Sequence, residues 1–177
     1  MDENMSVTNI GTTDVVNAIL GIDDASTLAQ LRNQKPELVT ELQAYYDSLF
    51  EPEQGSAEAL PVQSRALVAV RVASHTGSRA VADWYAQVAR DNGAADEAIS
   101  SARDISAPWP ESDALAAAIR HTDLLTTQPA AATRSDLEAL KAAGYTPAGI
   151  VSLSQTIAFV SYQLRLIAGL RALGGLA

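Results

Sequence analysis

The fold of this chain is decided by residues 64–103, which read SRALVAVRVASHTGSRAVADWYAQVARDNGAADEAISSAR. Apolar residues recur there at the spacing of one helix face, and Gly77 and Gly93 interrupt the pattern. A glycine directly after an apolar periodic run is a common helix stop. The stretch therefore predicts one helix over 61–76, a second over 78–92, and a short third helix that ends the stretch.

The segments on both sides of this stretch also follow helical patterns. Alanine and leucine dominate a hydrophobic fraction of 47%, whereas aromatic residues supply only 5%, and this composition favours helices over strands. Further helices are predicted over 14–20, 27–32, 36–50, 113–126, 133–144 and 147–173, with loops over 51–60 and 104–112. The sequence thus predicts an all-α fold.

One domain is expected, because 177 residues are enough to bury a substantial hydrophobic core. Residues 1–12 are polar and without periodicity, so they are predicted to form a flexible arm. Residues 13–60 are expected to form a short N-terminal layer of helices, and residues 61–177 the core bundle. In the loop after the third core helix, Trp109 is expected to pack down as an anchor.

The charge of the chain argues against several classes of partner. A formal net charge of −9 would repel both nucleic acid and anionic membrane surfaces. The first ten residues are acidic and polar rather than basic and then apolar, so no secretory signal is expected. No uninterrupted apolar run reaches the roughly 18 to 20 residues of a membrane span. We therefore expect a soluble, cytoplasmic protein.

The residue inventory also limits the chemistry. The chain has no cysteine, which rules out a disulfide, a thiolate nucleophile and a cysteine-bound metal. Its two histidines, His75 and His121, have no carboxylate at ligand spacing, so no metal site is expected. A phosphate-binding glycine loop, a serine nucleophile elbow and a dinucleotide fingerprint are all missing. The sequence predicts no cofactor.

Residues 64–103 resemble the core repeat of the carboxymuconolactone decarboxylase family, which includes the AhpD-like alkylhydroperoxidases. That repeat has a helix, a tight break, a second helix carrying Cys-x-x-Cys-x-x-x-His, and a glycine turn before a short acidic helix. Residues 150–175 resemble the closing helix of the peroxidase-related branch. The resemblance implies an AhpD-like helical bundle and an ancestral association with an antioxidant system.

The resemblance also places the family's catalytic motif on residues that lack its chemistry. The two cysteine positions fall on Ser78 and Val81, the histidine position on Tyr85, and the relay glutamate near Ala66. A serine hydroxyl cannot cycle through a sulfenic acid and a disulfide, and valine cannot act as a resolving group. Peroxide reduction by the family's thiol mechanism is therefore excluded for this chain.

Polar residues near this degenerate motif are the candidates for a site without thiols. His75 is either a general base or a solvated histidine at a helix C-terminus. Tyr85 either orients a substrate through its phenol or is an amphipathic core residue beside Trp84. Trp84 itself is a candidate residue of the pocket that would hold the substrate. On the last helix, Tyr162 and Arg165 either line a pocket or join subunits, and Arg165 is the candidate for binding an anion.

Other charged residues are expected to have structural roles. Arg79 and Asp83 lie four residues apart on one helix, which is the spacing of a surface ion pair. Arg171 is expected to complement the dipole at the end of the last helix. His121 and Asp123 are two residues apart and so do not share a helix face.

Three functions remain open at this point. The first is a pseudo-peroxidase, or a subunit that pairs with a cysteine-bearing paralogue. The second is a non-redox enzyme with decarboxylase or lactone-type acid–base chemistry, or a small-molecule binder that uses the remnant pocket. The third is a purely structural homo-oligomer. The resemblance implies dimers, trimers or hexamers, so a homo-oligomer is expected.

Overall fold

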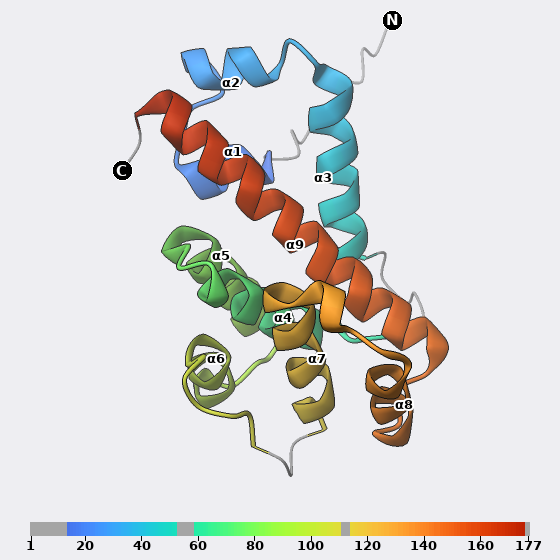
Figure 1. The fold of residues 1–177 in the computed structure, drawn as a ribbon. Helices are drawn as coiled ribbons and strands as arrows, with labels where there is room; N and C mark the ends of the chain where they lie inside the picture. Colours follow the sequence, from blue (N-terminus) through green and yellow to red (C-terminus); the bar gives the residue numbers. More distant parts are fainter. Residues whose placement is uncertain (1–13, 53–58, 111–113, 176–177) are drawn as a thin grey trace, which may run out of the picture.

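The computed structural model describes residues 14–52, 59–110 and 114–175. Within these ranges all regular structure is helical, which confirms the predicted all-α fold (Figure 1). The arm predicted over 1–12, most of the loop predicted over 51–60, and the first residue of the helix predicted over 113–126 lie outside the described residues.

The helices follow the predicted order with small changes at their ends. Their bounds are α1 Val15–Leu20, α2 Thr27–Arg32, α3 Pro36–Phe50, α4 Val62–His75, α5 Arg79–Asp91, α6 Asp96–Arg103, α7 Ala116–Thr127, α8 Arg134–Ala142 and α9 Pro147–Gly174. A short 3-10 helix, Pro129–Ala131, precedes α8 and was not predicted.

Local capping explains why several helices begin where they do. The Asp14 side chain accepts hydrogen bonds from the first-turn amides of α1, and the Ser26 side chain accepts one in α2. Thr133 and Asp136 form a capping box at the start of α8. These short polar side chains satisfy backbone N–H groups that have no partner inside the helix.

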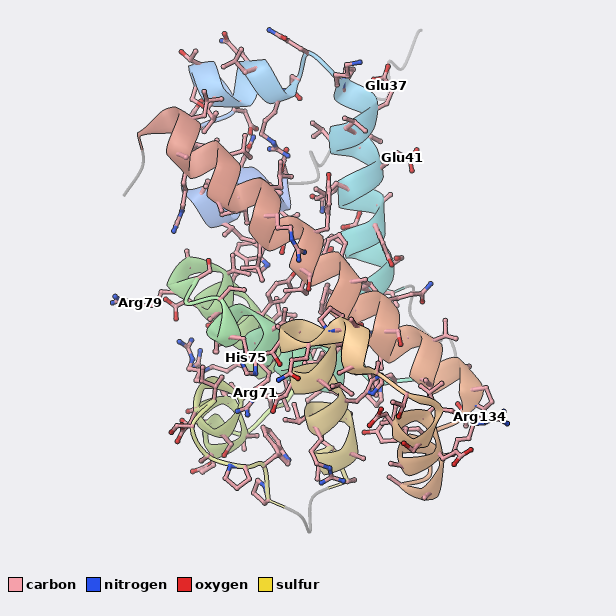
Figure 2. The ribbon with its side chains drawn as sticks, in the orientation of Figure 1. Glu37, Glu41, Arg71, His75, Arg79 and Arg134 are labelled. Carbon is pink, nitrogen blue, oxygen red and sulfur yellow. The ribbon has the colours of Figure 1, made fainter. Side chains whose placement is uncertain are left out.

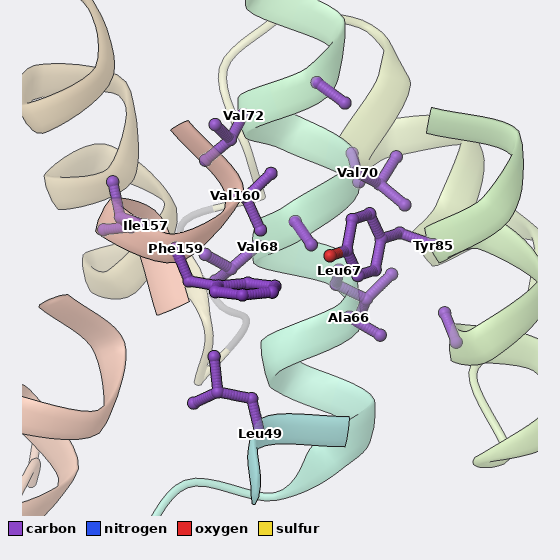
Figure 3. Close-up of a cluster of buried hydrophobic side chains, with 14 of the residues drawn as sticks. Leu49, Ala66, Leu67, Val68, Val70, Val72, Tyr85, Ile157, Phe159 and Val160 are labelled. Carbon is purple, nitrogen blue, oxygen red and sulfur yellow. The ribbon is translucent and has the colours of Figure 1, made fainter. Parts of the chain in front are cut away.

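Helix α4 lies at the centre of the bundle and packs against α3, α5, α6, α7 and α9. Every residue from Arg65 to Ala73 is buried, and a helix buried on all sides is typical of a core element. Figure 3 shows its valines packed between Tyr85 on one side and Phe159 and Val160 on the other. The hydrophobic core is therefore built around α4.

Helix α9 crosses the bundle from one end to the other (Figure 1). Within the described ranges it is the one helix that is long and apolar enough to cross a membrane, judged by length and composition alone. Half of its most apolar window is buried against the other helices, as in a core helix. Its remaining face, which includes Val151 and Tyr162, is exposed.

The break between α4 and α5 positions the candidate site. Gly77 adopts a left-handed φ of 69°, a conformation that favours glycine. The amides of Gly77 and Ser78 donate to the carbonyls of Ser74 and Ala73, at 3.1 and 3.2 Å, which ends α4 within a single turn. The chain can therefore restart as α5 beside the ends of α7 and α9. The predicted anchor, Trp109, is 5% exposed, which confirms its burial.

Candidate functional site

A pocket of about 360 Å³ opens beside this helix break, and we call it the break pocket. Its wall combines the break itself, the last turn of α7 and the second half of α9. The lining residues are Thr76, Gly77, Ser78, Thr126, Ser161, Leu164, Arg165, Ile167, Ala168 and Arg171. The volume falls within the range of small-ligand sites in proteins.

Two arginines of α9 supply the positive charge of the break pocket. Arg165 donates to the carbonyl oxygen of Ser161 on its own helix at 2.9 Å. Neither Arg165 nor Arg171 forms an ion pair within the part of the chain that the structure describes. In contrast, Arg32, Arg71, Arg90, Arg103 and Arg134 each pair with a carboxylate. The pocket thus keeps two guanidinium groups available in a chain whose net charge is −9.

Hydroxyl and amide groups complete the polar lining. Thr126 Oγ1 is buried and has no hydrogen-bond partner among the described residues. Ser78 is the N-cap residue of α5, but its side chain does not cap the helix. The first-turn amides of α5 therefore lack a side-chain acceptor beside the pocket. Unpaired buried donors and acceptors are costly, so this lining favours a polar occupant.

His75 forms part of a charged cluster next to the break pocket. Its Nε2 lies 2.7 Å from Oδ1 of Asp123 on α7. Arg71, one turn earlier on α4, donates to both oxygens of the same carboxylate, from Nε at 2.7 Å and from Nη2 at 2.9 Å. Figure 2 shows His75 and Arg71 close together on α4. The cluster joins α4 to α7.

The environment of Asp123 keeps its carboxylate charged. Burial raises the pKa of Asp123, but hydrogen bonds from Arg71 and His75 outweigh burial, so the pKa lies below its ordinary value. Arg71 Nη1 also donates to the carbonyl oxygen of Asp104 at 2.6 Å, and the Arg71 side chain is 3% exposed. A buried, multiply bonded arginine therefore fixes this carboxylate in place.

Three of the four positions that correspond to the family motif lie in the core. Ala66, Val81 and Tyr85 are each 0% exposed. The Tyr85 hydroxyl donates to Gln163 Oε1 at 2.7 Å, and burial raises the pKa of this phenol well above its ordinary value. The Tyr85 ring centroid lies 4.8 Å from that of Phe50. Of the motif positions, Ser78 alone lines the break pocket.

The other predicted site residues lie elsewhere. Trp84 is half-buried, and its Nε1 donates to the Tyr46 hydroxyl at 3.1 Å. Burial raises the pKa of Tyr46 to about 12, although the hydrogen bond from Trp84 lowers it. Tyr162 is 51% exposed and lines a separate apolar hollow with Leu38 and Tyr45 of α3. The structure therefore brings together Ser78 and Arg165, but not Tyr85, Trp84 or Tyr162.

One structural role expected from the sequence is wrong. Asp83 pairs with Arg103 at 2.7 Å rather than with Arg79, because α6 packs beside α5. Figure 2 shows Arg79 pointing away from the body of the protein. The error at Asp83 comes from considering one helix at a time. Arg171 lies in the last turn of α9, as expected, and it also lines the break pocket beside Arg165.

Sequence reasoning missed Arg71, Asp123 and Thr126 as parts of the site. One signal was present: Arg71 and His75 are four residues apart on an otherwise apolar stretch, which places both on one helix face. Two basic groups on a buried face indicate a carboxylate partner from another helix. Among the described residues, no group of three or more His, Cys, Asp or Glu side chains gathers as a metal site would.

The fold and the site together define an all-helical protein with a small pocket at the break between two core helices. Residues 36–123 match the model of the carboxymuconolactone decarboxylase family, and the chain belongs to this family. The match runs from the start of α3 to Asp123, so Arg165 and Arg171 lie outside it.

A solved structure supports the fold over a longer span. An uncharacterized peroxidase-related protein from Silicibacter sp. TM1040 superposes with a TM-score of 0.64 over 92% of this chain and 78% of that chain. The two sequences are 15% identical, so the likeness concerns the fold alone. Among curated proteins, none matches this chain.

Proposed function

We propose that this chain is a family member without thiol chemistry that binds a small anionic molecule in the break pocket. The observation that carries the proposal is the pair Arg165 and Arg171, which line the pocket without an ion-pair partner in the described ranges. Guanidinium groups bind carboxylates and phosphates through charge-assisted hydrogen bonds. Thr126 and Ser78 add hydroxyls that suit the same oxygen-rich ligands.

The fate of the motif positions supports a pseudo-peroxidase rather than a peroxidase. Val81 and Tyr85 are packed in the core, so these positions serve stability. Ser78 keeps its place at the start of α5 and lines the pocket. The scaffold that presents a thiolate elsewhere in the family thus presents a hydroxyl and two nearby cations here.

Replacing Arg165 and Arg171 with alanine tests the proposed anion site. Titration calorimetry with sodium succinate and sodium phosphate measures the dissociation constant in each variant. Because a hydrogen bond to a charged group is worth about 1.5 to 3 kcal/mol, each single replacement is expected to weaken binding about tenfold or more.

Arg79→Ala is the matched control, because Arg79 also has no ion pair within the described residues, points away from the body of the protein and does not line the pocket. It is expected to leave the dissociation constant unchanged within about twofold. Failure of both anions to bind the unmodified protein contradicts the proposal. An equal loss of affinity in all three variants also contradicts it.

We also propose that the protein is a homo-oligomer. The exposed face of α9 carries Val151 and Tyr162, at 56% and 51% exposure, and the neighbouring face of α3 carries Leu38 at 63%. Exposed apolar side chains grouped in this way mark interaction surfaces. Light scattering after size exclusion is expected to give the molar mass of at least a dimer. The Tyr162→Glu variant is expected to shift the measured mass towards that of a monomer. A monomer at tens of micromolar protein contradicts this proposal.

A further inference from the structure

We propose that Asp123, held by Arg71, positions His75 as a proton acceptor at the edge of the break pocket. This inference rests on the proposed function, because the anion bound in the pocket is the molecule that would give up the proton. It goes further by assigning acid–base chemistry to the site. Asp123 and Arg71 are positioning residues, since they act through the imidazole of His75.

The first step of the argument is the tautomer of His75. A carboxylate can only accept hydrogen bonds, so the 2.7 Å contact between Nε2 and Asp123 requires a proton on Nε2. In the neutral imidazole Nδ1 then carries the lone pair and is the basic nitrogen. Nδ1 forms no hydrogen bond within the described part of the chain and is not enclosed. It is therefore free to accept a proton.

The second step is the rigidity of the carboxylate. Arg71 binds both oxygens of Asp123, and it is held in turn by the carbonyl oxygens of Ser101 and Asp104, at 3.4 and 2.6 Å. The Arg71 side chain is 3% exposed, so it cannot easily move into solvent. A carboxylate fixed by other groups orients an imidazole far better than a mobile one does.

The third step is the position of the pair beside the break pocket. His75 directly precedes Thr76, and Asp123 lies one helical turn before Thr126, and both threonines line the pocket. The His75 and Asp123 side chains are 14% and 31% exposed, so solvent reaches both, while their neighbours Thr76 and Thr126 line the pocket itself. The acid–base pair thus adjoins the site where Arg165 binds the anion.

The chemical step is a single proton transfer. A polarised X–H bond of the bound anion breaks, its electron pair stays on the anion, and the lone pair of Nδ1 forms the new N–H bond. The resulting imidazolium is balanced by the Asp123 carboxylate, which remains unprotonated. The step needs neither an oxidant nor a metal.

Nitrogen-15 NMR of the imidazole groups tests the positioning role directly. The chain has two histidines, so the His75→Gln variant assigns the His75 signals. Above the titration range of histidine, the unmodified protein is expected to show His75 mainly as the Nε2–H tautomer. In Asp123→Asn, the amide NH₂ can donate to Nε2, and the population is expected to move to the Nδ1–H tautomer. Circular dichroism checks that this near-isosteric variant is folded.

The same NMR experiment also tests whether a bound anion contacts His75, with sodium succinate or sodium phosphate added as the probe. Binding of a probe is expected to shift the His75 Nδ1 resonance, and Arg165→Ala is expected to abolish the shift. A His75 that is mainly Nδ1–H in the unmodified protein overturns the inference. A bound probe that leaves Nδ1 unmoved overturns it as well. If neither probe binds, the proposed function is contradicted. The tautomer of His75 in the unmodified protein then tests, by itself, whether Asp123 positions the imidazole.

Discussion

Replacing Asp123 with alanine is expected to lower the free energy of unfolding by about 3 kcal/mol. The variant leaves the Arg71 guanidinium buried at 3% exposure without the carboxylate that accepts hydrogen bonds from its Nε and Nη2. An uncompensated buried charge is among the costliest single defects in a protein. Urea unfolding followed by circular dichroism measures the loss.

Asp83→Ala is the matched control for this prediction. Asp83 also accepts a 2.7 Å hydrogen bond from an arginine, Arg103, but the two side chains are 61% and 35% exposed. Because water screens exposed ion pairs, the control is expected to cost less than about 1 kcal/mol. Equal losses in the two variants contradict the view that the buried arginine makes Asp123 critical.

The same cluster predicts a dependence on pH. The folded-state pKa of Asp123 is below the ordinary value of 3.8, because hydrogen bonds from Arg71 and His75 outweigh the effect of burial. Its contribution to stability is therefore complete above pH 3.8 and is lost as the pH falls through the folded-state pKa. The stability difference between the unmodified protein and Asp123→Asn is expected to narrow over that acidic range. If this stability difference stays constant as the pH falls, the pH dependence does not come from Asp123, and the prediction is contradicted.

Replacing Tyr85 with alanine is expected to lower the free energy of unfolding by about 4 kcal/mol. Its side chain is fully buried against Phe50, and its hydroxyl is bonded to the buried Gln163. The change removes a ring from the core and leaves the amide oxygen of Gln163 without its partner. Both effects are destabilising, because cavities and unpaired buried polar groups each cost free energy.

Ile105→Ala provides the control, since it removes an apolar side chain that is 44% exposed and lies outside the proposed interface of α3 and α9. It is expected to change the stability of the monomer by no more than about 0.5 kcal/mol. Tyr85→Phe separates the two contributions at the buried position, because it keeps the ring and removes the hydroxyl. Similar stability of Tyr85→Ala and Ile105→Ala contradicts the core role of Tyr85.

The positions that correspond to the family motif divide between the pocket and the core. Ser78, Val81 and Tyr85 lie on one helix at spacings of three and four residues, so they share a face. The N-terminal member reaches the pocket at the helix break, whereas the other two face the core. At these two positions valine and tyrosine therefore contribute to the core and supply no thiol chemistry.

The helices, their order and the absence of thiol chemistry can all be predicted from the linear sequence. Helix starts at Asp14, Ser26 and Thr133 follow from side chains that bond to amides within the next few residues. The stop at Gly77 follows from a backbone angle that glycine adopts easily. These signals act over four or five residues, so they can be read from a linear chain.

Which side chains share the site depends on how the helices pack against one another. His75 and Asp123 are 48 residues apart, and Ser78 reaches Arg165 and Arg171 only because α9 folds back across the break between α4 and α5. Tyr85 and His75 seemed equally available in the sequence, yet packing buries the first and leaves the second partly open. Helical periodicity tells which residues share a face, but the partner of that face depends on how the helices pack.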